Sequence, residues 1–318
     1  MKEVLVLVPC RDRHRQMLRQ AGACRIMFGE DLSPEQRAQA IAHADAIVGE
    51  PEIAEIQTAE KLAWIQMTWA GTDKYTCTSG FPQEIALTTA SGAFGAVIAE
   101  YVFGGILSLY RRLPSYREQQ KRHIWRDCGS ERTIEGSRVL ILGAGDIGER
   151  LAGRFQAFGA HVTGIRRTAS RCPACFDEMG TLAELEERLA SADIVVGCLP
   201  NTPQTRHLLG ERELRRMKPD AVLVNVGRGS LIRTDELVRV LRDDHLLGAV
   251  LDVTEPEPLP EDHPLWAFDN VILTPHIAGS FGDEIARMGE YVVEECTHFM
   301  QHEPCRYEIT EQMLKTMA

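Results

Sequence analysis

The segment at residues 138–165 constrains the fold of this chain more than any other. An apolar run at 138–142 leads into Gly143-Ala-Gly145-Asp-Ile-Gly148, which is followed by a helical pattern and a second apolar run at 161–165. A glycine-rich loop between a buried strand and a helix, inside a βαβ unit, is the context in which this spacing indicates dinucleotide binding. We therefore expect a parallel α/β sheet with a nucleotide site at its edge.

Each glycine of this loop has its own task in that interpretation. Gly143 permits the tight turn, Gly145 lets the backbone approach a pyrophosphate, and Gly148 lets the helix pack closely on the strand. The N-terminus of the helix adds amide donors and a positive dipole. The alternative is a glycine turn that holds no ligand, and the complete βαβ context disfavours it.

Apolar runs separated by helical patterns extend this architecture along the chain. The later runs are nearly continuous, as in parallel strands buried on both faces, and they lie at 139–142, 162–165, 194–198, 221–226, 248–251 and 271–273. Earlier runs lie at 4–8, 46–48, 64–67 and 85–87. The pattern predicts an α/β protein with a six-stranded doubly wound sheet within residues 99–281 and a smaller sheet in the first hundred residues. A helical pattern at 283–296 is expected to return to the first unit.

The residues after the second strand of the βαβ unit bear on the choice of dinucleotide. NAD binding usually places an Asp or Glu there, which accepts a hydrogen bond from the ribose 2′-hydroxyl. This chain has Arg166, Arg167 and Thr168 instead. Two guanidinium groups and a hydroxyl suit a 2′-phosphate, so NADP is favoured over NAD. The alternative is that the two arginines are solvated loop charges.

The charge balance excludes two classes of partner. Among the 318 residues, 35 Lys and Arg stand against 46 Asp and Glu, which gives a formal net charge of −11. Nucleic-acid binding needs a basic face, and a peripheral membrane anchor needs Lys or Arg near anionic lipid. We therefore expect neither nucleic acid nor membrane as a partner.

Three further features indicate the cytoplasm. The nine cysteines are odd in number and scattered, as in a reducing compartment. The chain starts directly with a strand-like run, so no signal peptide is expected. The apolar stretch at 92–110 approaches the length of a membrane span, but Glu100 at its middle would be costly in lipid, so a buried helix is the better interpretation.

Three segments that follow late strands carry polar side chains typical of catalysis. They are 225–229 with Arg228, 252–260 with several carboxylates, and 274–279 with His276. In a doubly wound sheet these segments meet at the carboxyl edge, where ligands bind. Reduction of a ketone needs a proton donor for the oxygen, a role suited to histidine, and a cation for a carboxylate, a role suited to arginine. A carboxylate behind the histidine would fix its tautomer and stabilise its charged form.

These motifs together resemble those of the D-isomer-specific 2-hydroxyacid dehydrogenase family. The resemblance rests on GAGDIG at 143–148, NVGRG at 225–229, DVTEPEPLP at 252–260 and TPHIAG at 274–279, and also on WAGTD at 69–73, LPNTPQTRHLL at 199–209 and PLW at 264–266. It covers nearly the whole chain. It implies a Rossmann nucleotide domain, residues 99–281, inserted into a flavodoxin-like substrate domain made of residues 1–98 and 282–318. It also implies a homodimer.

The resemblance further implies the roles of individual residues. Arg228 would bind the 2-oxoacid substrate, His276 would be the acid and base, and Glu257 would pair with His276. Trp69, Ala70 and Gly71 would complete the substrate site, with the two amides of Ala70 and Gly71 holding the substrate carboxylate. The expected cofactor-binding residues are Gly143, Ala144, Gly145, Asp146, Ile147, Gly148, Arg166, Arg167, Thr168, Leu199, Pro200, Val226, Gly227, Arg228, Asp252, His276, Ala278 and Gly279.

Within the family, the basic residues after the second strand and the WAGTD loop look most like NADPH-dependent glyoxylate/hydroxypyruvate reductases. Glu257 argues against the formate dehydrogenase branch, which has Gln at the matching place. The expected reaction is reversible hydride transfer from NADPH, with NAD as the alternative cofactor, to a small 2-oxoacid. Two other functions stay open: an NAD-linked dehydrogenase of larger 2-oxoacids such as phenylpyruvate or ketopantoate, and a dinucleotide-sensing regulatory protein.

Cys172-Pro-Ala-Cys175 invites a metal or redox interpretation. A zinc site needs four ligands, and neither a second CxxC motif nor a nearby pair of histidines exists. Redox motifs of this type open a helix after a strand, whereas this pair is expected in a loop. No metal site is therefore predicted.

Overall fold

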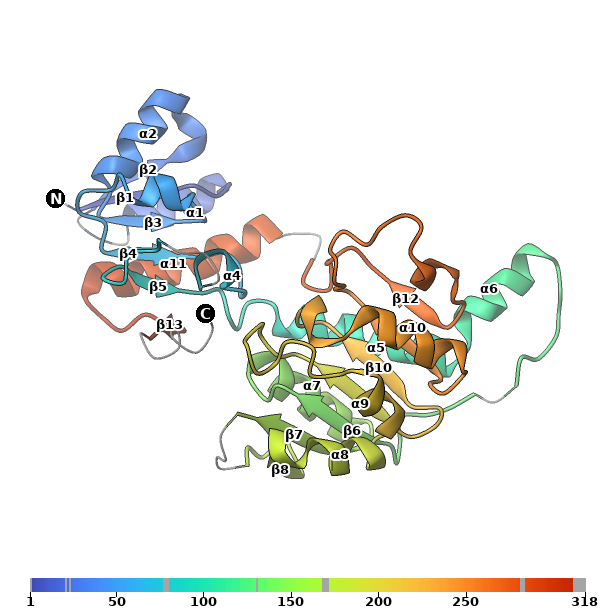
Figure 1. The fold of residues 1–318 in the computed structure, drawn as a ribbon. Coiled ribbons are helices and arrows are strands. Elements are labelled where there is room, and N and C mark those ends of the chain that lie inside the picture. Colours follow the sequence, from blue (N-terminus) through green and yellow to red (C-terminus); the bar gives the residue numbers. More distant parts are fainter. Residues whose placement is uncertain are drawn as a thin grey trace. The chain divides into compact units, whose positions relative to one another are not determined.

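The computed structural model describes residues 2–310 except 21, 23, 77–79, 130, 168–171 and 281–283. The chain divides into two compact units, one of residues 1–94 and 281–318 and the other of residues 95–280. Each unit is an α/β layer structure around its own sheet, which is parallel in the second unit and parallel except for one edge strand in the first (Figure 1). Thr168, one of the expected cofactor-binding residues, lies outside the described residues.

The sheet of the first unit has six strands among the described residues, in the order β13-β5-β4-β3-β1-β2. All neighbours are parallel except the pair of β13 and β5. The strands are β1 (Glu3–Val6), β2 (Arg25–Phe28), β3 (Ala46–Val48), β4 (Trp64–Gln66), β5 (Ala86–Thr88) and β13 (Glu308–Ile309). The sequence pattern predicted four of them and missed β2 and β13, which are the two edge strands.

Helices cover both faces of this first sheet. They are α1 (Asp12–Gln20), α2 (Pro34–His43), α3 (Ile53–Ile56), α4 (Asp73–Thr76) and α11 (Glu284–Gln301), with a 3₁₀ turn at Gly29–Asp31. Leu5 of β1 packs with α2, α3 and α4, whereas its neighbours Val4 and Val6 pack with α1 and α11. Alternate residues of a strand point to opposite faces, so α11 returns to the first unit and closes its second face, as predicted.

The second unit has seven parallel strands among the described residues, in the order β12-β11-β10-β9-β6-β7-β8. They are β6 (Arg138–Leu142), β7 (His161–Arg166), β8 (Glu178–Thr181), β9 (Ile194–Gly197), β10 (Val222–Asn225), β11 (Gly248–Leu251) and β12 (Val271–Leu273). The expected six-stranded sheet is therefore wrong by one strand. The additional strand, β8, is an edge strand of sequence EMGT, and it lacks the apolar run by which a buried strand is predicted.

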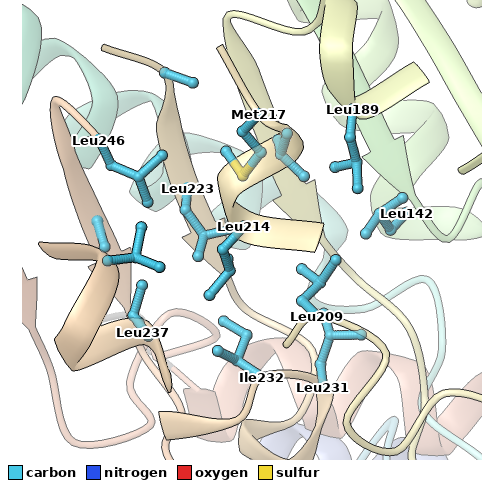
Figure 2. Close-up of a cluster of buried hydrophobic side chains, with 14 of the residues drawn as sticks. Leu142, Leu189, Leu209, Leu214, Met217, Leu223, Leu231, Ile232, Leu237 and Leu246 are labelled. Carbon is cyan, nitrogen blue, oxygen red and sulfur yellow. The ribbon is translucent and has the colours of Figure 1, made fainter. Parts of the chain in front are cut away.

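Helices cover both faces of the second sheet as well. They are α5 (Gly95–Tyr110), α6 (Leu113–Lys121), α7 (Asp146–Ala157), α8 (Leu185–Ser191), α9 (Glu211–Arg216) and α10 (Thr234–Arg242), with 3₁₀ turns at Leu182–Glu184, Gly229–Leu231 and Pro264–Ala267. Figure 2 shows the core under α8, α9 and α10, where Leu214 and Leu237 meet Leu223 of β10. On the other face, α5 packs on α7 and β11. The doubly wound architecture is confirmed.

The apolar stretch at 92–110 forms α5 and ends at Tyr110. Gly105 lies so close to β11 that a Cβ atom there would be 2.7 Å from a methyl group of Val250. Within the described part of the chain, no helix is both long enough and apolar enough to cross a membrane.

Candidate active site

The glycine-rich loop has the geometry that a dinucleotide requires. Gly143 has φ +108°, and a Cβ atom there would be 2.8 Å from the carbonyl oxygen of Cys198. A Cβ atom on Gly148 would be 2.2 Å from the carbonyl oxygen of Gly143, so only glycine lets α7 pack this closely on the loop. A Cβ atom on Gly145, by contrast, would meet nothing within 4 Å, which leaves the backbone open to a ligand. These three residues fit a pyrophosphate at the start of α7.

Arg166 is bound to the same loop. Its Nε donates a 2.7 Å hydrogen bond to the carbonyl oxygen of Ala144, and its Nη2 donates to Oε1 of Glu149 at 2.6 Å. Arg167, the next residue, is exposed. The structure thus brings one of the two expected phosphate-binding arginines to the loop, where it already holds a backbone carbonyl and a carboxylate.

The segments that follow β9, β10 and β11 pack so closely against one another that two positions in the segment after β10 require glycine. A Cβ atom on Gly227 would be 2.7 Å from the carbonyl oxygen of Leu199. A Cβ atom on Gly229 would be 2.0 Å from the carbonyl oxygen of Thr254. Arg228 lies between these two contacts, half-buried, and its Nη1 donates to the carbonyl oxygen of Gly227 at 2.7 Å. The backbone that carries Arg228 is therefore fixed on both sides.

His276 and Glu257 meet although 19 residues separate them in sequence. Nδ1 of His276 is 2.7 Å from Oε1 of Glu257, and both side chains are about half exposed. His276 has φ +57°, an uncommon backbone conformation for a residue with a side chain, and its amide donates to the carbonyl oxygen of Asp252. The second ring nitrogen of His276 is the one that can exchange a proton with a substrate.

A buried carboxylate holds the segment that carries His276. Asp252 is 2 % exposed and accepts hydrogen bonds from the amides of Ile277 and Ala278, both at 2.8 Å. It also accepts one from Oγ1 of Thr274 at 2.6 Å, and the Thr274 hydroxyl in turn lies 2.6 Å from the hydroxyl of Tyr101. Burial raises the pKa of Tyr101, so this hydroxyl stays protonated. Sequence reasoning missed Tyr101, because its helix is far from the motif in the chain.

A second ion pair holds the segment that carries Glu257. Oε2 of Glu255 is 2.5 Å from Nε2 of His207, and Oε1 is 2.6 Å from Nη2 of Arg206. Burial raises the pKa of Glu255, but the hydrogen bond with His207 and the charge of Arg206 outweigh burial and lower it. Both partners lie in the LPNTPQTRHLL motif, so the motif was visible in the sequence but its role was not.

The remaining expected residues lie as follows. Trp69, Ala70 and Gly71 belong to the first unit, in the turn after β4, and Trp69 is exposed. Glu50 holds the start of this turn, since its carboxylate accepts from the amide and the hydroxyl of Thr68. Other expected cofactor-binding residues of the second unit lie at the glycine-rich loop or in the segments after its strands: Ala144, Asp146, Ile147, Leu199, Pro200, Val226, Ala278 and Gly279.

Cys172 and Cys175 lie between β7 and β8, and both are free thiols. Among the residues that the structure describes, no group of three or more His, Cys, Asp or Glu could hold a metal ion.

Comparison with known proteins adds a family and several relatives. Residues 103–278 match the family model described as "D-isomer specific 2-hydroxyacid dehydrogenase, NAD binding domain". A glyoxylate reductase of Aeropyrum pernix is 37% identical over 228 residues, which cover 68% of this chain and 67% of the relative.

Two solved structures resemble the chain over nearly its whole length. A D-isomer specific 2-hydroxyacid dehydrogenase family protein from Aeromonas salmonicida subsp. salmonicida has a TM-score of 0.84 and 36% identity, covering 97% of this chain and 98% of its own. A D-isomer specific 2-hydroxyacid dehydrogenase from Xanthobacter autotrophicus Py2, in complex with NADPH and MES, has a TM-score of 0.81 and 27% identity, covering 99% of this chain and 100% of its own.

Proposed function

Because the chain belongs to the D-isomer-specific 2-hydroxyacid dehydrogenase family and is an NAD(P)-dependent oxidoreductase, we propose that it reduces a small 2-oxoacid of the glyoxylate or hydroxypyruvate type. The product is the corresponding D-2-hydroxyacid, or glycolate from glyoxylate, and the reaction is reversible. NADPH is the preferred cofactor. The glyoxylate reductase relative supports the proposed substrate, and the NADPH-bound structural neighbour supports the proposed cofactor.

The observation that carries the proposal is the contact between His276 and Glu257 in the unit that also holds Arg228 and the glycine-rich loop. All of these follow strands of one parallel sheet, at the edge where such sheets bind ligands. A nucleotide site, an acid–base pair and a cation are the three requirements of carbonyl reduction.

The roles of the three side chains follow from their contacts. When bound, the nicotinamide supplies the hydride. Nε2 of His276 donates a proton to the substrate oxygen, since Nδ1 faces the carboxylate of Glu257, which orients the ring. Arg228 binds the carboxylate and polarises the ketone, held in place by its bond to the Gly227 carbonyl.

The residues that hold the cofactor are the glycine-rich loop, the segments after β7, β9, β10 and β12, and Asp252. Gly143, Gly145 and Gly148 receive the pyrophosphate at the N-terminus of α7. Arg166 and Arg167 meet the 2′-phosphate of NADPH, because guanidinium groups form strong, charge-assisted hydrogen bonds with phosphate. Asp252, Ala278 and Gly279 would hold the nicotinamide end of the cofactor, and Leu199, Pro200 and Val226 would contact the rest of it.

The enzyme acts as a homodimer in a reducing compartment, the cytoplasm. Trp125 is fully exposed, and Leu113 and Ile124 are also exposed, on the segment formed by α6 and the residues after it. Figure 1 shows α6 standing clear of the layers of its own unit. Exposed apolar surface of this kind is typical of an interface, and a second copy of the same chain is its commonest partner. The eight described cysteines are all free thiols, as expected in a reducing compartment.

The test is a panel of 2-oxoacids assayed with NADPH and with NADH. We expect glyoxylate and hydroxypyruvate to give the highest kcat/KM, with NADPH preferred by at least about tenfold because each charge-assisted hydrogen bond contributes about 1.5–3 kcal/mol. Higher kcat/KM for phenylpyruvate or ketopantoate with NADH would contradict the proposed substrate and cofactor. Cofactor binding without turnover of any 2-oxoacid would instead indicate a dinucleotide sensor.

A further inference from the structure

Glu149 contacts Arg166, the residue proposed to meet the 2′-phosphate that distinguishes NADP from NAD. It belongs to the first turn of α7, directly after the glycine-rich loop, and its Oε1 accepts a 2.6 Å hydrogen bond from Nη2 of Arg166. Arg166 ends β7, the second strand of the βαβ unit, which is where the adenosine ribose is recognised in this architecture. The strand β7 itself carries no carboxylate at this end. Glu149 of α7 supplies one instead.

The guanidinium of Arg166 contacts both the glycine-rich loop and α7. Its Nε and Nη2 both donate to the carbonyl oxygen of Ala144, which fastens the end of β7 to the glycine-rich loop. Nη2 also pairs with Glu149, and neither side chain is deeply buried, since Arg166 is 29% and Glu149 45% exposed. A ligand can therefore reach this ion pair from solvent.

A 2′-phosphate and the Glu149 carboxylate are both anions that require the same cation. Binding of the phosphate at Arg166 places two negative groups around one guanidinium, so Glu149 must be displaced or must repel the phosphate. A ribose that carries a 2′-hydroxyl instead of a phosphate brings no such charge. The neighbouring acid, Asp146, is paired with Arg150 at 3.0 Å, so its charge is compensated within the same turn.

We propose that Glu149 is a specificity-determining residue, whose carboxylate competes with the 2′-phosphate for Arg166 and thereby reduces the preference for NADP over NAD. This inference rests on the proposed function, because it requires that the loop binds these dinucleotides. The inference concerns the ratio of the affinities for NADP and NAD, and not the rate of hydride transfer.

The test is the dissociation constant of NADP⁺ and of NAD⁺, measured by isothermal titration calorimetry on the full chain. Glu149→Gln keeps the size of the side chain and removes its charge. We expect it to tighten NADP⁺ binding about fivefold, the effect of one half-exposed charge at this range, and to change NAD⁺ binding less than about twofold. The matched control is Glu211→Gln on α9, which removes a carboxylate paired with Arg215 and Arg239 and should change neither constant.

A double variant separates this competition from a general effect on charge. In an Arg166→Gln background, Glu149→Gln should no longer favour NADP⁺, because the shared cation is absent. Equal tightening of both dinucleotides, no change in either, or weaker NAD⁺ binding with unchanged NADP⁺ binding would overturn the inference while leaving the proposed function intact. Weaker NAD⁺ binding would show that Glu149 holds the ribose hydroxyl. Absence of binding of both dinucleotides by the unmodified chain would instead refute the proposed function, and the inference with it.

Discussion

His276 and Glu257 follow different strands of one sheet, and Nδ1 of His276 lies 2.7 Å from Oε1 of Glu257. The backbone of His276 adopts φ +57° and is held there by the carbonyl oxygen of Asp252. The contact with Glu257 holds the ring by Nδ1. Nε2 is therefore the nitrogen to which the proposed function assigns the proton transfer.

The first prediction concerns the pair of His276 and Glu257. Reduction needs a proton donor for the substrate oxygen, and His276→Ala removes the proposed donor, so kcat/KM for the 2-oxoacid should fall about 10²–10⁴-fold. Glu257→Gln keeps the size of the side chain but removes the carboxylate that contacts Nδ1 of His276, so kcat/KM should also fall, by a smaller factor. Steady-state kinetics measure both effects.

The control for these variants is Glu261→Gln, which removes an exposed carboxylate a few residues beyond Glu257. Its kcat/KM should match that of the unmodified enzyme. If the kcat/KM of Glu257→Gln matched it too, Glu257 would not be the functional partner of His276, and Glu255 or Asp252 would be tested next.

The second prediction concerns Arg228. Arg228→Lys keeps the positive charge but loses the planar group that can bind a carboxylate with two parallel hydrogen bonds. KM for the 2-oxoacid should rise and kcat should fall, with kcat/KM lower by about 10²-fold for the loss of charge-assisted hydrogen bonds. Steady-state kinetics measure this, with Arg233→Lys, an exposed arginine nearby, as the control. Unchanged kinetics would show that Arg228 is only part of a turn.

The third prediction concerns the buried carboxylate of Asp252. Asn at this position has one acceptor oxygen where Asp has two, so its NH2 group would face either the amide of Ala278 or, in the flipped orientation, the amide of Ile277 and the hydroxyl of Thr274. Asp252→Asn should lower the free energy of unfolding by about 1–3 kcal/mol, the cost of unsatisfied buried donors. Tyr101→Phe, which removes only the hydroxyl facing Thr274, should cost about 1 kcal/mol. Urea unfolding measures both, and equal stability of Asp252→Asn and the unmodified chain would contradict the network.

The fourth prediction concerns thiol reactivity. Burial, with a contribution from Glu30, raises the pKa of Cys10 to about 11, and burial raises the pKa of Cys296 further above its usual range. The thiolate is the reactive form, so at pH 8 about one Cys10 side chain in a thousand is reactive. Iodoacetamide labelling followed by mass spectrometry should find the exposed Cys172 modified first. Rapid labelling of Cys10 or Cys296 in the folded chain at this pH would contradict their burial.

The fifth prediction concerns the proposed dimer. Trp125→Ala should weaken self-association at least about tenfold, because a tryptophan buried at the centre of an interface commonly contributes 2 kcal/mol or more. Sedimentation velocity over a dilution series measures the change. Trp266→Ala is the control, since Trp266 is also exposed and lies in the same unit. A monomeric unmodified chain, or a dimer unaffected by Trp125→Ala, would contradict the proposed interface.

The sequence alone determined the central strands and the loops that carry the proposed site. Strands such as β6 and β10 are buried on both faces, so their residues form continuous apolar runs that can be recognised locally. The edge strands β2, β8 and β13 have a neighbour on only one side, and short, polar segments suffice there. This is why the pattern gave a six-stranded central sheet in place of seven strands.

Contacts between loops needed the tertiary structure. The spacing of Glu255 and His207 in the sequence does not indicate that they meet, and the same is true of Tyr101 and Thr274. Each contact depends on which strands are neighbours in the sheet. The same holds for Arg166. Its guanidinium was predicted to bind phosphate from its place after β7, but the carboxylate of Glu149 reaches it from α7. Local sequence records the burial and turn chemistry of each segment, whereas the partner of a charged side chain depends on which segments the packed sheet brings side by side.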